Sequence, residues 1–389
     1  MEFKLVTEKD KSRIKWLWGY CFEREEPFYS WYFTDYYKNE NTLACYDKGQ
    51  MLAAVQLIPY ELMLRGKYFP VSYLVGLATF PEARNQRVVK KLLQASLLEM
   101  RSRGHYLSIL MPFKAGFYYP YQWYICYYRY RYKVRLRDFK RLGSIEGTFH
   151  FINDFTELDT LNYIYERFLD GKNGYIKRTC ANWRSIMECH WGYGGFIYLL
   201  KREQRPVGYI FYLLHEGEFL VRELAYVDFA AQKSLYQFMY KHRTQVERIN
   251  WQSASDDLTY CLLPEINSGV ELVGFMSGRI VDLEKLLVSL SYPADYKAEL
   301  ILQVEDNLAE WNNGLFKLSL NEGRMEVTRI SAVTPEVSCQ IGPLSQLVFG
   351  ALSVRQLVYL GKITVLASDK LAVLEKLFPV CSNFINEYF

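Results

Sequence analysis

Several features that would assign a protein class at once are missing from this 389-residue sequence. It holds no run of about 18 apolar residues, so neither a membrane-spanning helix nor a membrane partner is expected. Charged residues follow Met1 closely, so a signal peptide is not expected and we predict a cytoplasmic protein. Lys and Arg (47) exceed Asp and Glu (43) by only four, which argues against nucleic acid as a partner of the whole chain.

Cysteine and histidine form no recognisable site. None of the eight cysteines belongs to a CxxC pair, and Cys189-His190 lacks a second pair at zinc-finger spacing. A structural zinc needs four convergent ligands, so we expect no metal and interpret the cysteines as buried, reduced thiols. The five histidines have no Ser or Cys partner in a nucleophile motif, which disfavours an acyl-enzyme intermediate.

Aromatic residues are abundant, at 17% of the chain with 33 tyrosines, and favour large buried interfaces. The length predicts two or three domains. Residues 1–142 alternate strand and helix signals, and residues 143–282 contain a second strand–helix–strand order without obvious sequence identity to the first. Residues 283–389 contain strands followed by helices. We therefore predict three domains with these bounds.

Hydrophobic periodicity predicts the individual elements. In the first domain we expect a strand that ends at Pro59, a central strand over 71–80, an amphipathic helix over 82–103 and a strand over 106–111. Elsewhere we expect strands at 196–201, 207–214, 218–227, 248–251, 298–305 and 315–321, and helices at 230–243, 344–349, 354–359 and 370–378.

The junction between the central strand and the following helix is a candidate anion site. Free backbone N–H groups and the helix dipole favour phosphate at such a junction. Arg84, Arg87, Lys90 and Lys91 add positive charge there. A solvated basic helix face is the alternative interpretation. The candidate contacts are Leu77, Ala78, Thr79, Arg84, Asn85, Gln86, Arg87, Val88 and Val89.

Several sequence runs resemble one known family. Residues 76–93 (GLATFPEARNQRVVKKLL) resemble the acetyl-CoA pyrophosphate loop of the GNAT N-acetyltransferases, and residues 110–118 (LMPFKAGFY) resemble the stretch that leads to their active-site tyrosine. Further matches are Val304-Glu305-Asp306, Trp311-Asn312-Asn313-Gly314, Leu344-Ser345-Gln346-Leu347, Gly361 and the terminal Tyr388-Phe389. Over essentially its full length the chain resembles the "enhanced intracellular survival" acetyltransferases.

This resemblance implies an α/β (α+β) chain. Two tandem acetyltransferase-like mixed-sheet domains, the second degenerate, would precede a sterol-carrier-like α+β domain. Acetyl-CoA would be the co-substrate, bound by the nine candidate contacts, and would acetylate a primary amine of an aminoglycoside- or polyamine-like molecule by direct transfer. The resemblance makes Tyr118 the general acid and the terminal carboxylate of Phe389 the base. It also implies a homo-oligomer, with a hexamer as one expected state.

One position departs from the family pattern. Arg87 stands where the family has glycine, which lets the backbone approach the pyrophosphate, and Val89 replaces a later small residue. Arg87 could supply a guanidinium to a phosphate or could close the site. The alternative function is therefore a catalytically degenerate acyl-CoA- or lipid-binding protein.

A basic strand is predicted over 128–137 (YRYRYKVRLR). Its tyrosines would face one side, and Arg129, Arg131 and the later basic residues the other. Such interleaving can bind single-stranded nucleic acid. The small net charge favours instead a half-buried strand whose basic face is solvated or paired with acids.

Overall fold

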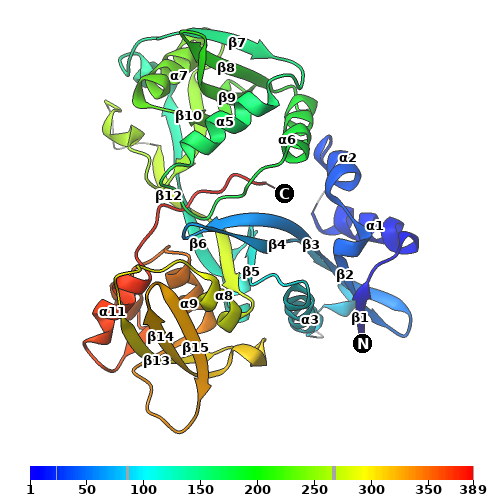
Figure 1. The fold of residues 1–389 in the computed structure, drawn as a ribbon. Coiled ribbons are helices and arrows are strands. Elements are labelled where there is room, and N and C mark those ends of the chain that lie inside the picture. Colours follow the sequence, from blue (N-terminus) through cyan, green and yellow to red (C-terminus); the bar gives the residue numbers. More distant parts are fainter. Residues whose placement is uncertain (23, 85–86, 265–268, 389) are drawn as a thin grey trace. The chain divides into compact units, whose positions relative to one another are not determined.

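The computed structural model describes residues 1–22, 24–84, 87–264 and 269–388 (Figure 1). Packing divides the chain into two compact units. Unit 1 consists of Met1–Tyr127, Asn173–Lys177 and Phe275–Phe389, and unit 2 of Tyr128–Lys172 and Arg178–Gly274. This grouping joins residues that are distant in the chain, and the three-domain division with its bounds stays a prediction.

Unit 1 is built on a mixed sheet. Its strands β4 (Lys67–Thr79) and β5 (Leu107–Leu110) pair in parallel, and α3 (Val88–Ser102) connects them along the chain. Apolar residues of α3 at a spacing of three to four, including Leu93 and Leu97, pack on one face of this sheet. The strand order is β1 (Glu2–Leu5), β2 (Thr42–Asp47), β3 (Gln50–Leu64), β4, β5 and β12 (Val270–Ile280).

The predicted end of a strand at Pro59 is wrong. β3 continues through Pro59 to Leu64 and pairs with β4 along this stretch. The pairing of β3 with β2 ends at Gln56, so at Pro59 the strand has a neighbour on the β4 side and lies beyond the end of β2. Proline is tolerated where its missing N–H removes no ladder hydrogen bond.

The predicted helix over 82–103 begins later than expected. Pro81–Ala83 forms a 3-10 turn, and α3 begins at Val88 because Arg87 adopts left-handed backbone angles, with φ 58° and ψ 18°. The helix end is as predicted, since Gly104 follows it with φ 74°.

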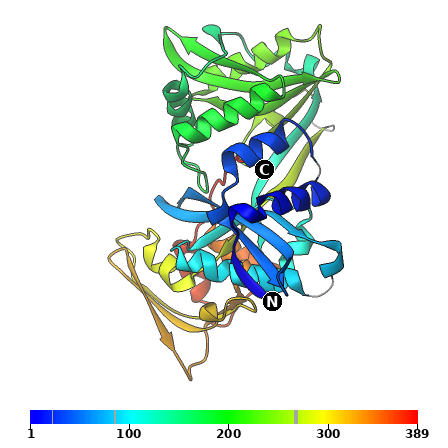
Figure 2. The ribbon, with the colours of Figure 1, turned by 90° about the vertical axis from the view of Figure 1, so that its right-hand side faces the viewer.

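The opposite face of the sheet is covered by α1 (Lys11–Cys21) and α2 (Phe28–Trp31), whose aromatic residues join a core cluster with Tyr73 and Ile385. A second sheet of unit 1 packs its apolar side on three helices, and its strands are yellow to orange in Figure 1 and Figure 2. Its order is β15 (Arg324–Ile330), β14 (Gly314–Asn321), β13 (Ala298–Glu305), β16 (Val337–Gln340) and β17 (Ile363–Val365), and its helices are α9 (Ile341–Val348), α10 (Val354–Tyr359) and α11 (Lys370–Leu377). A short helix, α8 (Leu283–Ser289), precedes β13, and α4 (Ala115–Tyr118) lies between β5 and β6.

Unit 2 repeats the crossover of unit 1. α7 (Phe229–Lys241) joins the parallel strands β10 (Glu218–Tyr226) and β11 (Arg248–Ala254). The strands predicted at 196–201 and 207–214 are confirmed as β8 (Phe196–Arg202) and β9 (Arg205–His215), and they form a hairpin linked by two residues with positive φ. The remaining elements are β6 (Tyr124–Arg135, in unit 2 from Tyr128), β7 (Thr148–Ile152), α5 (Leu158–Phe168) and α6 (Cys180–Gly192).

The basic strand, β6, is only partly as predicted. Arg129 is buried rather than outward-facing, whereas Arg131 forms an ion pair with Glu271 and Arg135 with Asp138. All eight cysteines are free. The prediction that they are buried is confirmed for Cys45, Cys126 and Cys339, whereas Cys21, Cys189 and Cys381 are half-buried and Cys180 and Cys261 are exposed.

Two further findings concern only the described part of the chain. No helix there has the length and apolar character needed to cross a membrane. No group of three or more His, Cys, Asp and Glu side chains there is arranged to hold a metal ion.

Candidate functional site

A cavity of about 640 Å³ lies where β4 ends and α3 begins. Seven of the nine candidate contacts line it: Leu77, Ala78, Thr79, Arg84, Arg87, Val88 and Val89. The other two, Asn85 and Gln86, lie outside the described residues. The end of α1 and aromatic residues from 113–121 complete the wall. The fold therefore brings seven of the contacts predicted from the sequence to one cavity.

The N-terminus of α3 is open towards this cavity. Arg87 occupies the N-cap position, and its side chain makes no capping hydrogen bond within the described part of the chain. The N–H of Lys91 bonds the carbonyl of Arg87, so the N–H groups of Val88, Val89 and Lys90 precede the first intrahelical bond. Arg87 is exposed and keeps a left-handed conformation that suits glycine, at a cost of about 1–2 kcal/mol for a residue with a Cβ. Arg87 therefore has backbone angles that a glycine at this position would adopt without strain.

The charge of the cavity is one-sided. Arg84, Arg87 and Lys90 line it, and the described lining residues include no Asp or Glu. The guanidinium of Arg84 lies 5.7 Å from the ring centroid of Tyr20, a weak cation–π contact beside the cavity. These cations and the positive end of the α3 dipole favour an anion of the size of a pyrophosphate.

A β-bulge in β4 lies beside the cavity. Ala78 pairs with Ala54 and Val75 with Gln56, so Gly76 and Leu77 together oppose the single residue between those partners. Gly76 has φ 60°, and a Cβ there would come within 2.4 Å of the Trp18 ring. A bulge leaves backbone groups of one residue without a ladder partner. Leu77, which lines the cavity, belongs to this bulge.

Tyr118 lies in the apolar cluster behind the cavity and is not itself among the lining residues. Its ring centroid is 5.9 Å from that of Phe113 and 5.0 Å from that of Phe117, and both of those rings line the cavity. The side chain is 5% exposed, and burial raises the pKa of Tyr118 to about 12. Among the described residues its hydroxyl has no hydrogen-bond partner.

The C-terminal tail lies in unit 1, on the face of the sheet opposite α3. The side chain of Asn173 donates to that of Asn383 at 2.6 Å, and the hydroxyl of Tyr73 donates to the carbonyl of Glu387 at 3.3 Å. Glu387 is buried, and Tyr388 packs with its ring centroid 5.3 Å from that of Phe275. The predicted base, Phe389, lies outside the described residues.

Glu387 was missed by sequence reasoning. Burial, and then nearby charges that include the carboxylate of Glu387, raises the pKa of Tyr60 and of Tyr127. An isolated glutamate in an aromatic tail gives no motif, so only the fold reveals a carboxylate among these tyrosines.

The equivalent junction in unit 2 is built differently. Asp228 is the N-cap of α7, and its carboxylate accepts a hydrogen bond from the N–H of Ala231 at 2.8 Å. The guanidinium of Arg202 donates to the same carboxylate at 2.5 Å. The chain's own acid therefore occupies the position that an anionic ligand would take.

Comparisons with known proteins match three segments of the chain. Residues 2–126 and 174–280 each match a family described as an acetyltransferase (GNAT) domain, and residues 283–385 match a sterol carrier protein domain. Each matched range lies inside one of the predicted domains, whose bounds stay a prediction. A search of curated proteins found no match.

Similar solved structures extend over the whole chain. A probable N-acyltransferase from Enterococcus faecalis is 20% identical with a TM-score of 0.89, covering 100% of this chain and 99% of that one. A GCN5-related N-acetyltransferase from Anabaena variabilis is 21% identical (TM-score 0.85), and Eis1 from Mycobacterium abscessus is 17% identical (TM-score 0.81); each match covers 100% of both chains. At these identities the likeness shows a shared fold, and with the family matches it confirms the predicted fold class.

Proposed function

We propose that this chain, which belongs to the GNAT acetyltransferases, transfers the acetyl group of acetyl-CoA directly to a primary amine. The N-acetyltransferase class follows from the two domain matches, and the fold implies an acyl-CoA co-substrate. We propose in addition that the transferred group is acetyl, that the acceptor is a primary amine, and that the residues named below have the roles given to them.

The cavity at the start of α3 is the observation that supports the proposal. A pyrophosphate there would receive hydrogen bonds from the first-turn N–H groups of α3 and charge from Arg84 and Arg87. Arg87 is exposed, and its backbone has left-handed angles that glycine adopts without strain. This arrangement favours an open acetyl-CoA site over the degenerate alternative.

The bulge at Gly76-Leu77 suits the thioester end of the co-substrate. A backbone N–H without a ladder partner can donate to the thioester carbonyl as negative charge develops on its oxygen. The amine nitrogen then forms a bond to the carbonyl carbon, and the carbon–sulfur bond breaks.

Tyr118 is the proposed donor of the proton that the leaving thiolate takes up. A phenol whose pKa is raised to about 12 keeps its proton at neutral and mildly alkaline pH, so the acid is present in its working form. The attacking amine must also lose a proton. The role that the resemblance gives to the terminal carboxylate of Phe389 stays a prediction, because that residue lies outside the described chain.

The acceptor is proposed to be a cationic amine of the aminoglycoside or polyamine class. The buried carboxylate of Glu387 and the rings of Tyr60 and Tyr73 lie on the sheet face opposite α3. A carboxylate and aromatic faces both attract ammonium groups. The cytoplasmic location and the homo-oligomer, with a hexamer as one state, stay predictions.

The test combines binding with turnover. Calorimetry should detect acetyl-CoA binding, and Tyr118→Phe should lower kcat by about 10²–10⁴-fold with little change in acetyl-CoA affinity, because the variant loses only the proton donor. CoA release with a panel of polyamines and aminoglycosides measures kcat. The adjacent, exposed Tyr119→Phe is the matched control and should keep its activity.

Two outcomes would count against the proposal. The absence of measurable acetyl-CoA binding in the wild type would favour the degenerate alternative. An active Tyr118→Phe beside an inactive Tyr121→Phe would move the acid role to Tyr121, which lines the cavity.

A further inference from the structure

We infer that the C-terminal part of the chain holds the tyrosine loop, residues 118–123, in its working position, with Gln122 and Arg279 as positioning residues. The inference rests on the proposed function, because it concerns the orientation of Tyr118. All residues involved belong to unit 1.

The tyrosine loop is a closed turn between α4 and β6. Tyr119–Tyr121 forms a 3-10 turn, Gln122 follows with φ 69°, and the N–H of Trp123 bonds the carbonyl of Tyr118 at 3.3 Å. The hydroxyl of Tyr118 has no hydrogen-bond partner in the described chain. Its orientation therefore depends on the loop backbone and on apolar packing.

Arg279 of β12 connects this loop to the C-terminal part of the chain. One arm of its guanidinium donates to the carbonyl of Tyr121 at 2.6 Å, and the other donates to both carboxylate oxygens of Asp306 at 2.7 Å. The guanidinium also lies 4.8 Å from the ring centroid of Trp123. Arg279 and Asp306 have fully buried side chains, so the link is shielded from water.

Further hydrogen bonds hold the carboxylate of Asp306 in place. Its carboxylate also accepts hydrogen bonds from the N–H groups of Leu308 and Ala309 and from the side chain of Asn312. The position of Arg279, and through it the carbonyl of Tyr121, is therefore set by the turn that follows β13.

Gln122 provides a second, independent link. Its side-chain nitrogen donates to the side-chain oxygen of Gln340 at 3.1 Å, and its side-chain oxygen accepts from the N–H of Gly342 at 3.1 Å. A Cβ on Gly342 would come within 2.4 Å of the Tyr124 ring and 2.8 Å of the Gln122 side-chain oxygen. Only glycine, which has no Cβ, lets the start of α9 lie this close to the loop.

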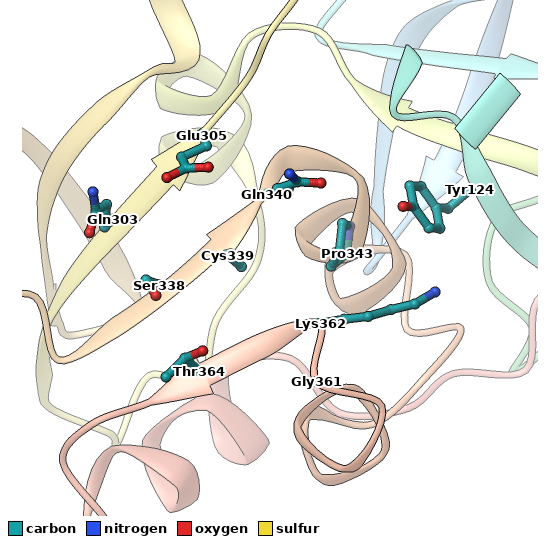
Figure 3. A pocket seen from close by; sticks show the side chains of 10 residues that line it. All are labelled: Tyr124, Gln303, Glu305, Ser338, Cys339, Gln340, Pro343, Gly361, Lys362 and Thr364. Carbon is teal, nitrogen blue, oxygen red and sulfur yellow. The ribbon is translucent and has the colours of Figure 1, made fainter. Parts of the chain in front are cut away.

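Figure 3 shows the surroundings of this second link. Gln340, at the end of β16, and Tyr124, directly after the loop, border a polar cavity of about 370 Å³. Gln303 of β13 lines the same cavity, away from Tyr124. Gln303 forms no hydrogen bond with the loop among the described residues, so a variant at this position serves as a control away from it.

The decisive variant is Gln122→Gly. Glycine adopts the positive φ of Gln122 without strain, so the change removes two hydrogen bonds and leaves the turn intact. We expect kcat to fall about 10- to 100-fold, because a small misplacement of a catalytic group costs that much, with little change in the KM for acetyl-CoA or in Tm. Arg279→Met is less informative, since it leaves Asp306 as a buried unpaired charge and can prevent folding.

Two further variants test the link from the other side. Gly342→Ala adds a methyl group against Tyr124 and Gln122 and should also lower kcat with the KM for acetyl-CoA unchanged. Gln303→Ala, the matched control, should leave kcat as in the wild type. In a Tyr118→Phe background, Gln122→Gly should add little, because Gln122 acts through the hydroxyl that is already missing.

The outcomes separate the inference from the proposed function. If Tyr118→Phe is impaired but Gln122→Gly and Gly342→Ala keep wild-type kcat, the positioning role is wrong and the function stands. If Gln122→Gly lowers kcat by the same factor with and without the Tyr118 hydroxyl, Gln122 does not act through Tyr118. A Tyr118→Phe variant with wild-type kcat would remove the acid role of Tyr118 and the inference that rests on it, whereas the absence of acetyl-CoA binding in the wild type would remove the function itself.

Discussion

The two strand–helix–strand crossovers of this chain share one topology and treat the helix N-terminus in opposite ways. In unit 1, β4 leads into α3 through a left-handed Arg87 whose side chain forms no cap among the described residues, and a cationic cavity adjoins the helix start. In unit 2, β10 leads into α7 through an extended Asp228, whose carboxylate bonds the N–H of Ala231. The same fold therefore keeps an anion site in one copy and fills it with its own acid in the other.

The difference has a cost in stability. An N-cap aspartate stabilises a helix by about 1 kcal/mol relative to alanine, and unit 2 has this contribution. Unit 1 lacks it at α3 and also holds Arg87 in a conformation that costs about 1–2 kcal/mol. This loss of stability at one junction is expected where a ligand, rather than a side chain of the protein, binds the free N–H groups of the helix.

The largest expected effect comes from giving unit 1 the acid of unit 2. Arg87→Asp replaces a cation with a carboxylate at the proposed pyrophosphate position and should weaken acetyl-CoA binding about 100-fold, through lost attraction and added repulsion. Calorimetry measures the change. Arg87→Asn is the control, because asparagine has the shape of aspartate without its charge. It should lose much less affinity for acetyl-CoA. Equal binding by the Asp variant and the wild type would mean that the anion does not lie at α3.

The reverse change in unit 2 should affect stability and not binding. Asp228→Ala removes the cap of α7 and the partner of Arg202, and should lower the free energy of unfolding by about 0.5–2 kcal/mol. Asp228→Asn retains a capping oxygen and should lose less. Denaturant unfolding followed by circular dichroism measures the difference. A second acetyl-CoA per chain in the Ala variant would contradict this expectation, because it would mean that Asp228 alone keeps the ligand out of unit 2.

Much of this comparison could be predicted from the sequence, because it rests on local patterns. The apolar spacing of α3, the hairpin at Glu203-Gln204 and the basic residues after β4 are all short-range signals. The start of α3 was misplaced because periodicity does not register a single left-handed residue such as Arg87. Asp228, two residues before the helix predicted at 230–243, is a readable N-cap signal that places the helix start at Phe229.

The long-range features could not be predicted in the same way. Nothing in the sequence pairs Arg279 with Asp306, and no pattern brings Glu387 beside Tyr73. The burial of Arg129 also depends on its neighbours in the folded sheet rather than on strand alternation. The parts of the site that lie far apart in the chain required the structure.

The smallest expected effect restores the family residue at the open junction. Arg87→Gly removes the left-handed strain and should raise the free energy of unfolding by about 1 kcal/mol, because glycine reaches a positive φ without a steric cost. It should also preserve or tighten acetyl-CoA binding, since the backbone N–H groups of α3 remain and the approach of the pyrophosphate becomes closer. Denaturant unfolding and calorimetry measure the two quantities on one preparation. Binding that appears only in the Gly variant, with none in the wild type, would mean that Arg87 closes the site, and both junctions would then be blocked by the chain itself.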